Sequence, residues 1–183
     1  MDNGESSYRR FLNGDERAFS EIIGLHKDNL IFFINRYVRN IAVAEELAED
    51  VFVEILLHKR RYNFKYSLKT YIFTIARNIA VSYVRKCARN PEFAYDYIEN
   101  ESDAKNLEDE FSHKEDVRAL HEALGRIPQD YRTALHLIYF EDMSYEQAGR
   151  VMKKNRKQIE NLVYRAKIAL RKEMEKEASL REE

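Results

Sequence analysis

The sequence predicts an all-α protein made of two small helical domains joined by an acidic linker. Apolar residues recur every three or four positions over most of the chain, which is the spacing of amphipathic helices. The 183 residues include only 5 glycines and 2 prolines, too few for a turn-rich β protein. One stretch, 89–112, is acidic and weakly periodic, and its Asn90-Pro91 pair ends the preceding helix.

The apolar spacing also places the individual helices. Before the linker we expect helices at 16–39, 42–59 and 68–88, with a loop at 60–67. After it we expect helices at 114–126, 129–140, 145–152 and 156–175. The inward stripe of 129–140 includes Ala134, Ile138 and Tyr139. A capping box of the form S-x-x-Q, made by Ser144 and Gln147, begins the helix at 145–152. The resulting domains are 1–90 and 114–183, with the linker at 91–113.

The net charge of −1 conceals blocks of opposite sign. Residues 55–91 hold 9 basic and no acidic side chains, and 150–172 hold 9 basic and 1 acidic. Between them, 92–116 hold 2 basic and 10 acidic side chains. Near-neutrality is therefore a cancellation, and it does not exclude a protein that binds nucleic acid.

The first basic block has aromatic residues spread through it, namely Tyr62, Phe64, Tyr66, Tyr71, Phe73 and Tyr83. Basic side chains neutralise phosphates and aromatic rings stack on unpaired bases, so the combination favours binding of single-stranded nucleic acid. A solvated basic face is the alternative interpretation of the block, and core packing is the alternative for Tyr71 and Phe73.

The second basic block lies in a helix-turn-helix pattern. A short capped helix, a turn at Lys153-Lys154-Asn155 and a long basic helix are typical of this motif, whose second helix enters the major groove. Arginine, asparagine and glutamate can read guanine, adenine and cytosine there. The outward positions are Arg156, Lys157, Glu160, Asn161, Tyr164, Arg165 and Lys167. A three-helix bundle with a solvated basic face remains the alternative.

Other classes of protein and site are not indicated. The single cysteine, Cys87, excludes an internal disulfide and fits a reducing compartment. The polar N-terminus and the short apolar run 30–34 predict neither a signal peptide nor membrane insertion, so we expect a cytoplasmic protein. The five histidines lack metal-binding spacing, and no nucleophile or acid/base arrangement is recognisable. We expect no catalytic residues, no metal, no cofactor and no enzymatic activity.

Motifs in both halves resemble sigma-70-type transcription initiation factors of the compact extracytoplasmic-function (ECF) group. The stretch 44–52 is similar to the family's "AEDLVQEVF", and 71–78 is similar to "WLYRIARN". In the second half, 144–149 is similar to "LSYEEIA" and 164–167 to "HRAR". The resemblance covers 15–90 and 114–172, and it depends on the order and spacing of all the pieces together.

The resemblance implies a promoter-specificity subunit with sigma domains 2 and 4, which binds core RNA polymerase, recognises −10 and −35 promoter elements and melts DNA. Docking on the β′ clamp helices would use Glu45, Glu46, Glu49 and Asp50. The −10 element and non-template strand would meet Arg60, Arg61, Asn63, Phe64, Lys65, Tyr66, Lys69, Tyr71, Arg77 and Arg85. The −35 duplex would meet Arg156, Lys157, Gln158, Glu160, Asn161, Tyr164 and Arg165. The implied further partners are the polymerase β flap and an anti-sigma factor.

The sequence departs from the family pattern at a few positions. Tyr71 replaces the family's usual tryptophan, and Glu160 and Leu162 stand where basic residues are common. A −35 preference therefore does not transfer from relatives. Two other functions stay open: a conventional helix-turn-helix regulator that binds duplex operator DNA on its own, and a helical adaptor whose basic faces meet acidic proteins. For the sigma factor we expect the free chain to bind DNA poorly.

Overall fold

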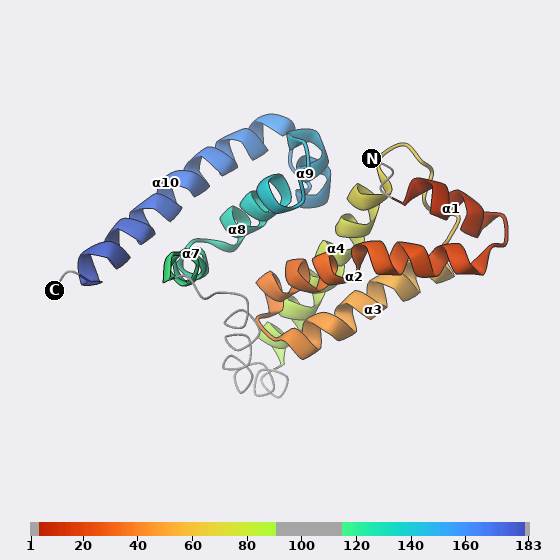
Figure 1. Cartoon of the computed structure of the whole chain (residues 1–183), viewed down its shortest axis with the longest axis horizontal. Coiled ribbons are helices and arrows are strands. Elements are labelled where there is room, and N and C mark those ends of the chain that lie inside the picture. The colour runs from red at the N-terminus through yellow and green to blue at the C-terminus, as the bar shows by residue number, and fades with distance from the viewer. Residues whose placement is uncertain (1–3, 91–114, 182–183) are drawn as a thin grey trace.

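The computed structural model of the chain describes residues 4–90 and 115–181, which form helices joined by short loops (Figure 1). These described residues contain no β-strand. The helices form an N-terminal unit, residues 4–90, and a helix-turn-helix unit, residues 115–181. The expectation of an all-α protein with two helical domains is confirmed, and the segment predicted as the linker, 91–113, lies outside the described residues.

The N-terminal unit consists of α1 (Glu5–Leu12), α2 (Glu16–Val38), α3 (Ile41–Leu57) and α4 (Leu68–Arg89). Side chains begin three of these helices: Asp15, Asn40 and Ser67 each accept a hydrogen bond from a backbone N–H two or three residues later. Arg39, at φ 53°, ends α2 in the left-handed conformation. Helices α2 to α4 agree with the predicted ranges within two residues at each end.

Helix α1 was not expected from the sequence. Tyr8 and Phe11 are buried, and the Tyr8 hydroxyl donates a 2.8 Å hydrogen bond to the carbonyl of Lys59. The ring of Tyr8 also meets that of Tyr62 edge-on, with centroids 5.0 Å apart. The stripe of Tyr8, Phe11 and Leu12 covers only two turns, which is shorter than the window from which helical periodicity is read.

The core of the N-terminal unit is built from α2, α3 and α4. Phe33 and Phe73 are fully buried, with ring centroids 5.1 Å apart, and Val51 and Ile72 are buried beside them in the same cluster. Phe73 therefore belongs to the core rather than to a nucleic-acid surface, as the alternative interpretation of this residue held.

The helix-turn-helix unit consists of α7 (Glu115–Arg126), α8 (Gln129–Leu135), the π-helical turn η1 (His136–Phe140), α9 (Tyr145–Met152) and α10 (Arg156–Arg181). The predicted capping box at Ser144 and Gln147 is present. Lys153, at φ 56°, ends α9 and starts the turn. A Cβ at Gly149 would lie 2.5 Å from the Lys154 carbonyl oxygen, so this turn requires glycine.

The π turn corrects the prediction of one helix over 129–140. The chain is α-helical only to Leu135, and the amide of Glu141 then bonds to the carbonyl of His136, five residues back. The wider turn shifts the side-chain register, so Tyr139, expected inward, is 50% exposed. His136 and Glu141 are buried instead.

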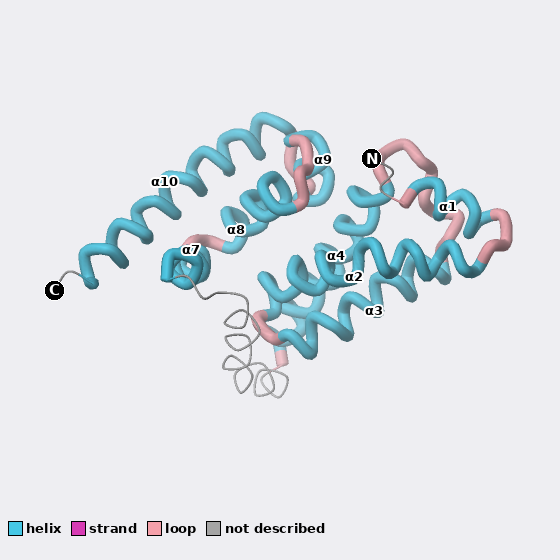
Figure 2. Tube along the Cα trace, in the orientation of Figure 1, coloured by secondary structure: helices cyan, strands magenta, loops and turns pink. Residues whose placement is uncertain are grey.

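The two units pack against each other. Helix α4 contacts α9, and α2 contacts α8, so that the helix-turn-helix unit lies along one side of the N-terminal unit (Figure 2). The Tyr37 hydroxyl accepts a 3.0 Å hydrogen bond from Thr133 across this interface. No pattern in the sequence indicated the interface, because the residues that meet there are far apart in the chain.

Candidate nucleic-acid interface

The loop between α3 and α4 is held in a defined shape by its own side chains. Tyr62 is buried, its hydroxyl donates to the Tyr66 carbonyl at 2.7 Å, and its ring stacks on Tyr71 at 5.2 Å with 29° between the planes. The Asn63 side-chain oxygen accepts from the Lys65 amide at 3.1 Å. These contacts fix the conformation of the loop, and its other side chains therefore project from defined positions.

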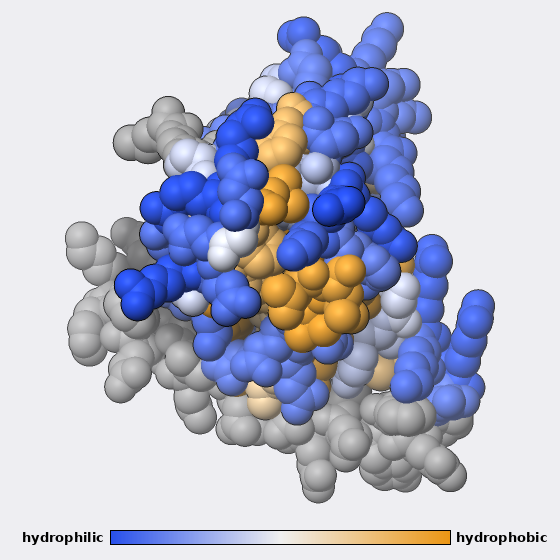
Figure 3. Space-filling model, turned by 90° about the vertical axis from the view of Figure 1, so that its right-hand side faces the viewer, coloured by the Kyte–Doolittle hydropathy of each residue, from blue (hydrophilic) through white to orange (hydrophobic). Residues whose placement is uncertain are grey.

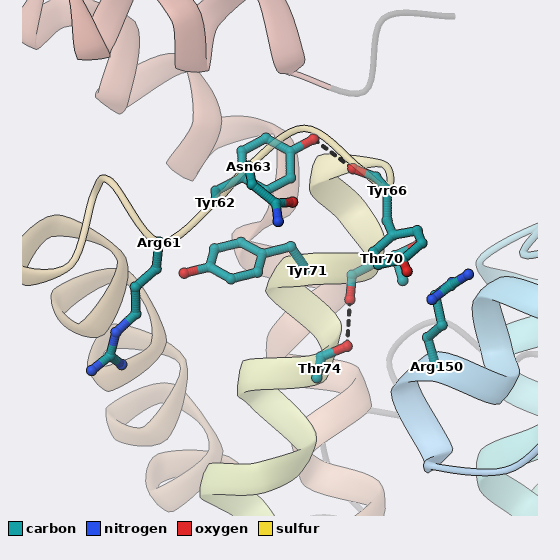
Figure 4. A pocket seen from close by; sticks show the side chains of 8 residues that line it. All are labelled: Arg61, Tyr62, Asn63, Tyr66, Thr70, Tyr71, Thr74 and Arg150. Carbon is teal, nitrogen blue, oxygen red and sulfur yellow. Dashed lines mark hydrogen bonds between the residues drawn. The ribbon is translucent and has the colours of Figure 1, made fainter.

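A cavity of about 370 Å³ opens between this loop and the first turns of α4 (Figure 4). The lining residues are Arg61, Tyr62, Asn63, Tyr66, Thr70, Tyr71, Thr74 and Arg150. The volume is in the range of sites that enclose small organic groups. Aromatic faces, an amide, hydroxyls and guanidinium groups together suit an unpaired nucleobase with its phosphate.

Two tyrosines of the cavity, Tyr62 and Tyr71, carry no charge at physiological pH. Burial raises the pKa of the Tyr62 phenol above its ordinary value. Burial also raises the pKa of Tyr71, with Arg61 acting in the opposite direction to a smaller extent. The phenols therefore stay protonated and add no repulsion toward a phosphate.

The structure brings part of the predicted −10 set together. Arg61, Asn63, Tyr66 and Tyr71 line the cavity. The other basic residues of the set lie outside the lining: Arg60, Lys65 and Arg85 are exposed, Arg77 is partly buried along α4, and Lys69 is partly buried at its start. Lys69 is also paired with Glu141 of the helix-turn-helix unit at 2.8 Å.

Phe64 is turned away from the cavity and packs against α1. Its ring centroid lies 6.1 Å from that of Tyr8, and the Arg9 guanidinium lies 4.0 Å from the same ring. Phe64 also has the left-handed φ of 58°. It packs against α1 and does not line the cavity, although it belongs to the set that the resemblance assigned to the −10 element.

The predicted docking acids Glu45, Glu46, Glu49 and Asp50 are all exposed on α3. Beside them is an apolar groove of about 300 Å³, which the sequence analysis missed because its walls come from two helices. The lining residues are Phe19, Ile23, Lys27, Glu49, Phe52, Val53 and Leu56. Figure 3, which views this end of the molecule, shows apolar surface bordered by hydrophilic surface. Such a patch is typical of a protein–protein interface.

The start of α10 is fastened by a second capping box, in which the Asn155 and Gln158 side chains each accept a 2.8 Å hydrogen bond from the other residue's amide. Arg156 forms 2.9 Å ion pairs with Glu146 and Glu160. Three of the predicted −35 residues, Arg156, Gln158 and Glu160, thus also have structural partners. Lys157, Asn161, Tyr164 and Arg165 are exposed.

Sequence reasoning also missed Arg150, Thr70 and Thr74 in the cavity wall. The Arg150 guanidinium lies 3.3 Å from the centroid of the Tyr66 ring, although α9 and the loop are far apart in the chain. Over the described ranges, no helix is long and apolar enough to cross a membrane. The same residues hold no group of side chains placed to bind a metal ion.

Two family models match the chain: Sigma-70 region 2 over 22–90, and Sigma-70, region 4 over 117–170. Among curated relatives, the ECF RNA polymerase sigma factor SigW of Bacillus subtilis is 23% identical over 88% of this chain and 91% of that protein. The RNA polymerase sigma-H factor of Pseudomonas aeruginosa is 24% identical over 91% of each chain.

Solved structures show the same fold. CnrH, in complex with the cytosolic domain of CnrY, superposes with a TM-score of 0.66 at 18% identity and covers 92% of this chain and 95% of its own. The sigma factor RpoE of Bartonella quintana, in complex with the anti-sigma factor NepR, gives a TM-score of 0.66 at 22% identity over 86% and 96%.

Proposed function

The chain belongs to the sigma-70 family, and from this premise we propose that it binds core RNA polymerase, captures the −10 element as a single strand in its N-terminal unit and reads the −35 element as a duplex with α10. The sigma-factor function itself follows from the family. The observation that carries the finer assignment is the aromatic and basic cavity at the start of α4.

Melting would proceed by base flipping. A base that leaves the duplex stacks on Tyr66 or Tyr71, while Asn63 and the hydroxyl of Thr70 or Thr74 offer hydrogen bonds to its edge. Stacking on an aromatic side chain contributes about 1–3 kcal/mol per base, which offsets the cost of unpairing without ATP. The exposed basic side chains of the loop, such as Arg60 and Lys65, would bind the phosphates.

Reading of the −35 element is assigned to the exposed face of α10. Asn161 and Arg165 have groups that pair with adenine and guanine, and Lys157 would contact the backbone. Glu160 would have to break its ion pair with Arg156 before it could accept from cytosine. We therefore expect Glu160 to hold Arg156 in place more than to read a base.

Polymerase docking is assigned to α3 and the groove beside it. The exposed acids Glu45, Glu46, Glu49 and Asp50 suit a basic partner surface, and the apolar groove supplies area to bury. We assign this face to the β′ clamp helices and the helix-turn-helix unit to the β flap, in the cytoplasm. An anti-sigma factor is a further proposed partner, since CnrH and RpoE were solved with CnrY and NepR.

The two alternative functions are disfavoured by the family assignment. A conventional regulator would pair its helix-turn-helix with an effector domain, whereas the region 2 match spans 22–90 of this chain. An adaptor protein would have no use for a cavity that combines stacked tyrosines with arginines.

Run-off transcription tests the proposal. The chain, bacterial core polymerase and a library of promoter fragments should yield transcripts from a discrete set of templates. Reversing the charge of Glu49 and Asp50 to lysine should reduce these transcripts about tenfold, because the docking surface would then repel a basic partner. Asp28→Lys, at an exposed acid of α2, is the matched control and should leave transcription unchanged. Transcripts no different from those of core polymerase alone would exclude the proposed function.

A further inference from the structure

Phe64 has a backbone conformation that is unusual for an aromatic residue. Its φ of 58° lies in the left-handed region, which bulky side chains disfavour. Among the other non-glycine residues that the structure describes at positive φ, Arg39 and Lys153 end helices, where this conformation is common. Phe64 ends no helix, so contacts elsewhere must offset the cost of its conformation.

The ring of Phe64 makes these contacts with α1 and with the loop itself. The Arg9 guanidinium lies 4.0 Å from the ring centroid, and the fully buried Tyr8 meets the ring edge-on at 6.1 Å. Tyr62 contacts it from within the loop, with centroids 4.6 Å apart. A planar guanidinium over an aromatic face is a favourable contact. Phe64 is thus held on the side of the loop that faces α1.

Helix α1 is in turn fixed to the rest of the N-terminal unit, beside which it lies in Figure 1. The Tyr8 hydroxyl donates a 2.8 Å hydrogen bond to the Lys59 carbonyl, just after the end of α3. Ser7 donates a 2.7 Å hydrogen bond to Glu21 of α2, and Arg10 pairs with the same carboxylate. Because α1 is joined to α2 and to the start of the loop, it holds Phe64 from a fixed position.

The neighbours of Phe64 in the chain are residues of the cavity. Asn63 and Tyr66, on either side of it, both line the cavity (Figure 4). The Asn63 side-chain oxygen accepts a 3.1 Å hydrogen bond from the Lys65 amide, so the turn closes around Phe64. The same side chain has an NH2 group that can donate to a base. A donor of this kind distinguishes bases only when its position is fixed, and that position depends on the backbone at Phe64.

We propose that Phe64 is a positioning residue for −10 recognition, and that Arg9 of α1 holds its ring so that Asn63 presents one fixed group to the captured base. The proposal rests on the assignment of the cavity to the −10 strand. Neither Phe64 nor Arg9 lines the cavity, so both act through the loop. The Sigma-70 region 2 match begins at residue 22 and therefore assigns no role to α1.

Run-off transcription with core polymerase tests the proposal on pairs of templates that differ at one −10 base. With the unchanged protein, the selected template should be preferred about tenfold, the usual effect of one wrong base. With Phe64→Gly this preference should fall to about twofold, because the ring that fixes the loop is lost. Glycine adopts positive φ without strain, so the variant removes the ring without forcing the backbone.

Arg9→Ala tests the same contact from the side of α1. The preference should fall in the same direction, and Arg9→Lys should restore only part of it, because lysine keeps the charge but not the planar group. Arg9 is exposed, so its replacement should leave the protein folded even if Phe64→Gly does not. Arg17→Ala, at an exposed cation of α2, is the matched control and should leave the preference unchanged.

A merely structural role of Phe64 would give a different pattern. Phe64→Tyr keeps the ring and should retain the preference, whereas Phe64→Gly should lose it while transcription from the altered template is kept. If Phe64→Gly reduced transcripts from both templates equally, the ring would serve only folding and the proposal would be overturned.

The failure of the proposed function would look different again. If the unchanged protein showed no preference at any −10 position, both the cavity assignment and the positioning proposal would fall. If a preference existed and persisted in Phe64→Gly and Arg9→Ala, only the positioning proposal would fall.

Discussion

Tyr71 shows how one side chain of this protein serves both packing and binding. One face of its ring is stacked on the buried Tyr62, and the residue also lines the cavity (Figure 4). The stack fixes the orientation of the ring before nucleic acid arrives, so less side-chain entropy is lost on binding. A tyrosine can thus supply the aromatic surface for which the family commonly uses tryptophan.

Replacing Tyr71 with alanine should reduce open-complex formation about tenfold or more, because a stacking contact of about 1–3 kcal/mol is lost. Affinity for core polymerase should stay unchanged, since the docking acids lie on α3. Tyr71→Phe keeps the ring and should retain most of the activity. Fluorescence of 2-aminopurine placed in the −10 element measures opening, and a parallel loss of opening and polymerase affinity would show that Tyr71 serves only the core.

Gly149→Ala should destabilise the helix-turn-helix unit by about 1–3 kcal/mol, the usual cost of forcing extra volume into a packed site. The added Cβ would meet the Lys154 carbonyl oxygen at 2.5 Å, and backbone cannot move aside as a side chain can. Gly24→Ala in α2, where a Cβ would meet nothing within 4 Å, is the matched control and should stabilise by about 0.5–1 kcal/mol. Urea unfolding compares the two, and equal effects would contradict the tight turn.

At the scale of elements, the sequence predicted α2, α3, α4 and the short α9 within two residues at each end, but it missed α1 and the π turn. Helices α2, α3 and α4 have long apolar stripes and side-chain caps, so composition and spacing define them. Helix α1 has only two turns, which is too short for its apolar stripe to predict a helix. The helix is stabilised by contacts of Tyr8 with Tyr62 and Lys59, which lie far along the chain. The π turn after Leu135 could not be predicted, because apolar spacing does not reveal one inserted residue.

Helix α1 positions the loop that forms the cavity, which gives it a measurable role. Tyr8→Ala should destabilise the N-terminal unit by about 3–5 kcal/mol, because a fully buried ring is removed from between three aromatic neighbours. Tyr8→Phe loses only the hydrogen bond to Lys59 and should cost about 1 kcal/mol. Chemical unfolding measures both, and a small effect of the alanine variant would show that α1 is not part of the folded unit.

At the scale of the whole molecule, the structure places the two basic regions in contact rather than apart. Charge blocks in the sequence separated an acidic helix face, a basic segment with aromatic residues and a basic helix, and these residues lie on α3, on the loop with α4, and on α10. What the sequence could not reveal is that Arg150 and Glu141 meet Tyr66 and Lys69, because no local pattern links residues so distant in the chain.

The contact between the two units should weaken in mild acid. Burial lowers the pKa of His136 below its ordinary value of 6.5, and Arg36 of α2 and Lys69 of α4 act in the same direction against the hydrogen bond to Glu141. Burial alone would raise the pKa of Glu141, but hydrogen bonds with His136 and Lys69 outweigh it and the net shift is downward. His136 and Glu141 would therefore take up protons more readily with the units separated than with the units packed together.

Both pKa values are lowered, so both groups make the contact between the units weaker as the pH falls. The contribution of His136 is complete above pH 6.5 and is lost as the pH falls below that value, and that of Glu141 is lost below its ordinary 4.5. Small-angle scattering should show a larger radius of gyration at pH 5.5 than at pH 7.5, with the change reduced in His136→Gln. A radius that is constant with pH in the unchanged protein would contradict a neutral, buried His136 at the interface.

Permanganate footprinting can show whether this chain melts a promoter, and melting distinguishes a sigma factor from a regulator that binds closed duplex. On a promoter obtained by run-off selection, non-template thymines around the −10 element should become reactive only when core polymerase and this chain are both present. Tyr71→Ala should suppress that reactivity while polymerase stays bound. Protection of duplex DNA by the chain alone, with no reactive thymine in the presence of polymerase, would contradict the account.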